Sequence, residues 1–191
     1  MIAATNRLYK LLAAGLVAVT VSTASADTIA TFADPSLGPN NPLFELSGNK
    51  LNGGWSDLGL TLIVPVTGMV YPNATFTMTE LTWDGMFGLS GGTLKFFDAG
   101  QQMVLQIDFD KAMFYWLGFG ADGMIGANVT MTGPGIPSPL YEESFAFSFA
   151  NQRATPTGYT WTASFTSSAV PEPSSLLLVG LGAWGLVRRR S

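Results

Sequence analysis

The sequence contains no cysteine and no histidine. Without cysteine the chain can form no disulfide bond, and it has neither a thiol nucleophile nor a thiolate metal ligand. Without histidine it cannot build a Ser-His-Asp triad or a His-containing zinc site within one chain. Acid–base chemistry would fall to carboxylates, lysine or tyrosine. We therefore expect a protein that is not an enzyme, with no catalytic residue, no metal site and no cofactor.

Basic residues are scarce between the two ends of the chain. From Asp27 to Ala169 there are four basic residues against twelve acidic ones, a net charge of −8. Such a segment repels the phosphate backbone, so nucleic acid is excluded as a partner. The acidic surface favours solubility outside a cell.

The N-terminus has the three parts of a secretory signal peptide. Arg7 and Lys10 form the positive region, and a mostly apolar run follows from Leu11 to Thr23. The small residues Ala24 and Ala26 then form an A-x-A cleavage site before Asp27. We expect residues 1–26 to be a signal helix that is removed on export.

The C-terminus combines a proline segment, an apolar run and an arginine cluster. The segment Pro171-Glu172-Pro173 favours an extended backbone. Residues 174–187 carry no charge and predict a transmembrane helix of roughly 21 Å, short of the roughly 30 Å hydrocarbon core. Arg188, Arg189 and Arg190 would stay cytoplasmic, which places the preceding residues on the outer side of the membrane.

Residues 170–191 closely resemble the PEP-CTERM sorting signal, in which the same three parts stand at the end of an exported chain. The resemblance implies an exosortase as partner, a membrane-embedded, cysteine transpeptidase-like enzyme that cuts near Pro171-Glu172-Pro173. It also implies transient residence in the inner membrane of a Gram-negative host that makes extracellular polysaccharide. The rest of the exported chain would then reach the cell surface or biofilm matrix, where polysaccharide or other surface proteins are further partners.

Short runs with period-2 alternation fill the middle of the chain and predict an all-β domain. Apolar residues alternate with polar ones in segments 103–110, 145–149 and 159–166, and between residues 74 and 83 the apolar face switches near Glu80. We expect an antiparallel β-sandwich of jelly-roll or Ig-like order, or a flattened barrel, over residues 55–169. Residues 27–54 are rich in turn formers and predict a mostly irregular segment, with a strand near Thr28–Phe32.

Two alternatives compete with a non-enzymatic surface protein. A carbohydrate-binding module would present a row of exposed aromatic rings, and Trp55, between glycine and serine, is the best candidate for exposure. A carboxylate-dependent glycoside hydrolase would place two acids about 5–10 Å apart in a cleft. Its candidate carboxylates are Glu80, Asp84, Asp108, Asp110, Glu142 and Glu143. Each of these acids also suits a solvent-facing strand or turn.

Overall fold

The structure, a computed structural model, describes residues 26–36, 38 and 40–171. This part of the chain is made of strands and two short 3₁₀ helices, as the alternating pattern predicts. The strands are β1 (Asp27–Phe32), β2 (Phe44–Ser47), β3 (Lys50–Trp55), β4 (Thr61–Val64), β5 (Met69–Pro72), β6 (Thr75–Met78), β7 (Leu81–Thr82), β8 (Gly88–Phe97), β9 (Met103–Tyr115), β10 (Gly118–Ala121), β11 (Val129–Thr132), β12 (Leu140–Thr155) and β13 (Gly158–Pro171). The 3₁₀ helices are η1 (Pro65–Thr67) and η2 (Gly123–Ile125).

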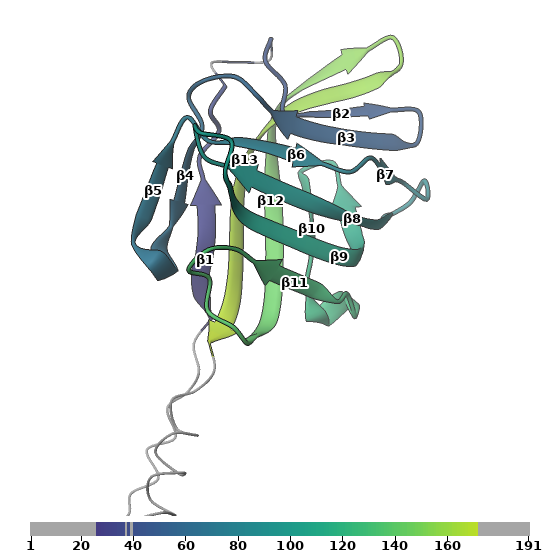
Figure 1. The fold of residues 1–191 in the computed structure, drawn as a ribbon. Coiled ribbons are helices and arrows are strands. Elements are labelled where there is room, and N and C mark those ends of the chain that lie inside the picture. The colour runs from purple at the N-terminus through teal and green to yellow at the C-terminus, as the bar shows by residue number, and fades with distance from the viewer. Residues whose placement is uncertain (1–25, 37, 39, 172–191) are drawn as a thin grey trace, which may run out of the picture. The chain divides into compact units, whose positions relative to one another are not determined.

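Eight antiparallel strands close into a barrel in the order β12-β10-β9-β8-β6-β3-β2-β13, because β13 pairs back onto β12 (Figure 1). The barrel is therefore the correct one of the two expected architectures, and the two-sheet sandwich is wrong. Closure depends on the long hairpin of β12 and β13, which pairs from Leu140 opposite Pro171 to Thr155 opposite Gly158. Different parts of β13 also pair with β1 and with β2, so one strand belongs to the barrel wall and to an extension of the sheet.

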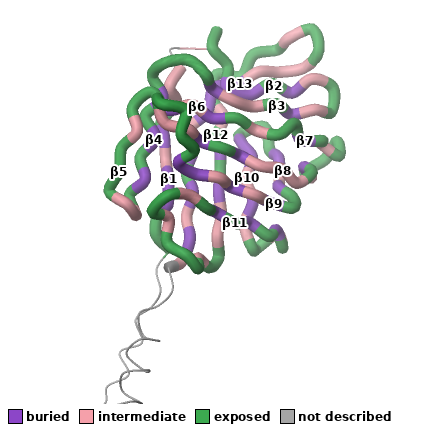
Figure 2. The backbone as a smooth tube through the Cα atoms, viewed as in Figure 1, coloured by how far each residue is buried: buried purple, intermediate pink, exposed green. Residues whose placement is uncertain are grey.

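The barrel interior is filled mainly by phenylalanine. Phe147 lies among Phe32, Phe44 and Phe165, with ring centroids 4.9–6.2 Å apart. The predicted inward faces of segments 145–149 and 159–166 are confirmed at Phe145, Phe147, Trp161, Ala163 and Phe165, which are all buried. Phe149 and Tyr159 are only partly buried, and Thr162, expected on the opposite face, is buried as well. Figure 2 shows buried positions along the barrel strands and exposed ones at the loops and turns. In segment 103–110, Leu105, Ile107 and Phe109 are buried as expected, whereas Met103 is exposed.

The segment 27–54 is not mostly irregular, as the turn formers suggested. It contains β1, β2 and nearly all of β3, of which β2 and β3 belong to the barrel wall. The expected strand near Thr28–Phe32 is present as β1. The turn signal at Gly53 has another cause: a Cβ there would overlap the Phe44 ring, so glycine lets the ring pack against the strand. The face switch near Glu80 is a break between β6 and β7.

A three-stranded extension leaves the barrel along β13. In it β1 pairs with β13, β4 with β1 through Thr31 opposite Ile63, and β5 with β4. Strand β5 is the last strand of this extension (Figure 1). Among the described residues no helix has the length and apolar character needed to cross a membrane. The signal helix and the transmembrane helix expected at residues 1–26 and 174–187 lie outside the described residues, apart from Ala26.

Candidate functional site

The C-terminal sorting segment begins inside the barrel wall. Pro171, the first residue of the Pro-Glu-Pro motif, is the last residue of β13 and pairs with Leu140 of β12. Its neighbour Val170 pairs with Tyr141. No spacer therefore separates the folded domain from the motif. An enzyme that cuts beside Pro171 must approach the end of the barrel itself.

The predicted signal-peptide junction lies beside the same strand end. Asp27 is the first residue of β1 and pairs with Ala169 of β13, and both Ala26 and Asp27 are exposed. The start of β1 and the end of β13 lie together at one end of the barrel (Figure 1). The other predicted processing residues lie outside the described part of the chain: Ala24, Glu172, Pro173, Arg188, Arg189 and Arg190.

Hydrogen bonds of side-chain hydroxyl groups stabilise the pairing of β13 with β1 and β12 next to this junction. The register of β1 against β13 shifts between Thr28 and Ala30. There the buried Ser167 hydroxyl accepts a hydrogen bond from the Ala30 amide at 3.1 Å and donates one to the Ala30 carbonyl at 3.3 Å. On the other side of β13 the hydroxyls of Ser144 and Ser168 are 2.9 Å apart. The hydroxyl of Ser167 replaces backbone partners that the register shift removes.

A bulge in β12 separates the last pairs of the hairpin from the rest. The register shifts between Tyr141 and Ser144, and Glu142 has a positive φ of 51°. The neighbouring Glu143 carboxylate accepts a hydrogen bond from the Met131 amide of β11 at 2.7 Å. Burial raises the pKa of Glu143, while that hydrogen bond opposes the rise. The last two residues of β13, Val170 and Pro171, therefore pair with β12 beyond this bulge.

Trp55 is not exposed, contrary to the prediction. It ends β3 with 7% of its surface accessible, and its indole N–H is sealed from the surface without a hydrogen-bond partner in the described residues. It borders a shallow depression of about 780 Å³ whose lining is part polar and part apolar and includes Asn41 and Asp57. Its flanking Gly54 and Ser56 suggested a loop, but the register of β3 turns the ring inward. A largely covered indole offers little face for stacking on a sugar ring.

Five of the six candidate carboxylates, Glu143 among them, accept hydrogen bonds from neighbouring groups or form an ion pair with one. Asp108 accepts from the Thr93 hydroxyl and the Gln106 amide, each at 2.6 Å. Asp84 caps its own turn by accepting from the amides of Met86 and Gly88. Glu80 lies 3.3 Å from the Lys50 ammonium group on the surface.

The Asp110 carboxylate is hydrogen-bonded to Asn128, the residue just before β11. It accepts from the backbone amide of Asn128 at 2.9 Å and from its side-chain amide at 2.6 Å. These hydrogen bonds lower the pKa of Asp110. No group of three or more acidic side chains placed to hold a metal ion occurs within the described ranges. The contacts of these acids are those of strand surfaces and turns.

Sequence reasoning missed an exposed apolar surface around the β9–β10 hairpin. Tyr115, Trp116 and Leu117 at its tip are exposed, as are Met86 and Phe87 before β8. Their rings do not form a flat row: Phe87 and Tyr115 are inclined by 40°, and Trp116 is inclined by 75° to Tyr159. The run of apolar residues at the hairpin turn could have predicted this surface.

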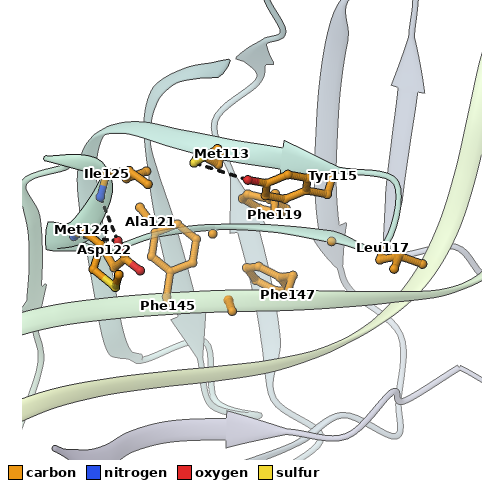
Figure 3. Close-up of a pocket in the computed structure, with 13 residues that line it drawn as sticks. Met113, Tyr115, Leu117, Phe119, Ala121, Asp122, Met124, Ile125, Phe145 and Phe147 are labelled. Atoms are coloured by element: carbon orange, nitrogen blue, oxygen red, sulfur yellow. Dashed lines mark hydrogen bonds between the residues drawn. The ribbon is translucent and has the colours of Figure 1, made fainter. Parts of the chain in front are cut away.

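A shallow, mostly apolar depression of about 620 Å³ lies beside this hairpin (Figure 3). Met113 and Tyr115 border it from β9, and Met124 and Ile125 border it from η2. The one carboxylate of its described lining, Asp122, caps η2 by accepting from the amides of Met124 and Ile125. The Asp122 carboxylate is thus occupied by its capping hydrogen bonds, and the Tyr115 hydroxyl donates to the Met113 sulfur at 3.7 Å.

Comparison with known proteins gives a match at the C-terminal end of the chain. No curated protein and no solved structure matches the chain. One family model does match it, over residues 169–191, so the match begins at the buried Ala169 of β13 and includes the Pro-Glu-Pro segment and the arginine cluster. The chain carries a PEP-CTERM protein-sorting motif at its C-terminus.

Proposed function

We propose that this chain is an exported cell-surface or extracellular-matrix protein, sorted and processed through its C-terminal tail. An exosortase recognises the tail in the inner membrane, cuts near Pro171-Glu172-Pro173 and releases the barrel domain outside. The observation that carries the proposal is the PEP-CTERM match over residues 169–191. The arginines at positions 188–190 and the predicted signal peptide agree in placing the barrel domain outside the inner membrane.

The chemistry of the barrel supports a non-enzymatic role outside the cell. Its net charge of −8 favours solubility and repels nucleic acid. Its candidate acids contact neighbouring amides, hydroxyls and a lysine, which are structural contacts. In a polysaccharide-rich matrix such a domain contacts polysaccharide or other surface proteins through its outer faces.

A carbohydrate-binding role is the second candidate. The exposed rings of Phe87, Tyr115 and Trp116 around the β9–β10 hairpin favour it, because sugar rings stack on exposed aromatic faces. Affinity electrophoresis in gels containing the host's polysaccharide tests it. Retardation that is lost in Tyr115→Ala and Trp116→Ala, but kept in Met124→Ala, supports binding at the hairpin. Equal mobility of all these proteins with and without polysaccharide contradicts it.

The intact mass of the protein from membrane, surface and medium fractions of its host tests the main proposal. We expect a species that begins at Asp27 and ends near the Pro-Glu-Pro segment. Glu172→Ala should leave the tail uncut, whereas the matched change Glu142→Ala, outside the motif, should be processed normally. Wild-type protein that keeps Arg188–Arg190 in the inner membrane would overturn the proposal.

A further inference from the structure

The sheet has an open edge at β5. Closure of the barrel pairs each of its eight wall strands on both sides, whereas β5 pairs only with β4. No other described strand lies along its outer edge. An unpaired edge presents a row of backbone N–H and C=O groups that can pair with another strand. Proteins often protect such edges with charged side chains, and β5 has none.

Apolar side chains surround this edge. Met69 and Val70 of β5 are 49% and 55% exposed, and Ile63 of β4, directly opposite Val70, is 40% exposed. Ile63 and Val70 share the outer face of the extension, so they form an apolar strip that ends at the open edge. The strip and the open edge together make a surface suited to another β-strand.

The charge distribution favours a second copy of the chain as the occupant. From Leu58 to Thr79 there is no charged residue, and this stretch contains β4, η1, β5 and β6. Two domains that each carry a net charge of −8 repel one another, and the repulsion is smallest where uncharged surfaces meet. The exposed surface at the β9–β10 hairpin is less suitable, because Asp84 and Asp122 lie in the turns beside it.

We propose that β5 of one copy pairs with β5 of a second copy, antiparallel and related by a two-fold axis perpendicular to the sheet. This symmetry keeps the outer faces of both extensions on the same side, so the strip of Ile63 and Val70 continues across the interface. Pro72 has no N–H, which centres the pairing on Met69–Tyr71. So short a strand pair buries well under about 1,200 Å², the range of weak interfaces. Such an interface acts where copies are crowded, as on a cell surface.

Cysteine cross-linking tests the pairing in the full chain as its host makes it. The sequence has no cysteine, so each substitution introduces a single thiol. Val70→Cys is the test variant, and Met124→Cys, at a position 95% exposed on η2, is the matched control. After mild oxidation, we expect a disulfide-linked dimer about tenfold more abundant for Val70→Cys, because pairing raises the local thiol concentration and disulfides require close Cβ atoms.

Two further variants keep the result interpretable. Met69→Cys, also at an exposed position, replaces Val70→Cys if reducing gels show that the latter does not accumulate; it is read with a short bismaleimide cross-linker, because the two copies of residue 69 lie diagonally across a pairing centred on Val70. In Met69→Cys with Val70→Lys, the added charge at the strip should reduce the dimer to the level of the control. Co-expression of a tagged and an untagged copy identifies the product, since a dimer of this chain gives three bands.

Three results overturn the proposal. They are the absence of a dimer from both Val70→Cys and Met69→Cys, equal dimer yields from the test and control positions, and cross-linking to a species of another mass. The first two would show that β5 has no partner copy, and the third would show that its edge pairs with a different protein. Because cross-linking is read on full-length and processed bands alike, a failure of tail processing leaves the test unaffected.

Discussion

Gly158 should be one of the positions least tolerant of a side chain. It begins β13, and a Cβ at this position would overlap the carbonyl oxygen of Leu46 in β2. In real structures Cβ atoms essentially never approach other heavy atoms within 3.0 Å, so Gly158→Ala must push β13 and β2 apart. That movement strains the pairs of Gly158 with Ser47 and of Tyr159 with Leu46.

The expected cost follows from the overlap and the strained ladder. Forcing extra volume into a packed site costs roughly 1–3 kcal/mol. Each weakened backbone hydrogen bond adds about 1 kcal/mol. We therefore expect Gly158→Ala to lower the free energy of unfolding by about 2–4 kcal/mol, and the Tm by roughly 5–15 °C for a domain of this size.

Thermal unfolding of the protein purified from its host, followed by circular dichroism, measures this effect. The matched control is Gly123→Ala on η2, where a Cβ would meet no atom within 4 Å. The control should change the free energy of unfolding by no more than about 0.5 kcal/mol. If Gly158→Ala unfolds at the temperature of the control, β2 and β13 are not as close as described, and the argument for barrel closure at this point fails.

Four further predictions concern the core, two of the acids and the junction. Phe147→Ala should lower the free energy of unfolding by about 3–5 kcal/mol in urea titrations, while Ser148→Ala, on the outward face, should change it little. Because burial raises the folded pKa of Glu143, its contribution to stability is present below about pH 4 and falls as pH rises through that pKa. Glu143→Gln should therefore gain stability relative to wild type as pH rises above about 4, and level off once the pH exceeds the raised pKa. Because the folded pKa of Asp110 is lowered, wild type should be more stable than Asp110→Asn above about pH 4, and this difference should vanish as pH falls. For Glu143→Gln and Asp110→Asn alike, a pH-dependent stability difference of the opposite sign contradicts the assigned contacts. A Gly-Ser spacer between Val170 and Pro171 should speed tail removal in pulse-chase labelling by about 5–30-fold, since opening the last strand pairs costs about 1–2 kcal/mol. The same spacer in the turn at Asp98–Gly100 should leave the rate unchanged.

Local patterns in the sequence predict the strands but not their partners. The alternation in segments 145–149 and 159–166 identifies which side chains face inward, because a strand with one buried face must alternate. A sandwich and a barrel both bury one face of each strand, so the same alternation is compatible with either. The pairing of β13 with β12, β1 and β2 decides between them, and it joins residues as distant as Asp27 and Ala169.

The candidate site, too, could be predicted from the sequence only in part. The motif at the C-terminus could be predicted because its proline, apolar and arginine parts follow one another in the chain. The absence of a spacer before Pro171 could not, since it depends on the pairing of Leu140 with Pro171. Trp55 was misassigned for a related reason: glycine and serine indicate a turn locally, whereas the register of β3 against β2 and β6 places the indole on the inner face.

The pairing of Asp27 with Ala169 also sets how the domain responds to force. A load applied between the two ends of the domain would peel β1 from β13 one residue pair at a time, which is a weak direction because each step breaks few hydrogen bonds. A domain whose N-terminus is free would carry no load along that path. Force from a neighbour bound at β5 would instead pass through β4 and β1 to β13, and in the described residues β1 pairs with β4 only at Thr31 opposite Ile63. That single residue pair would therefore be the weakest point between the open sheet edge and the end of β13.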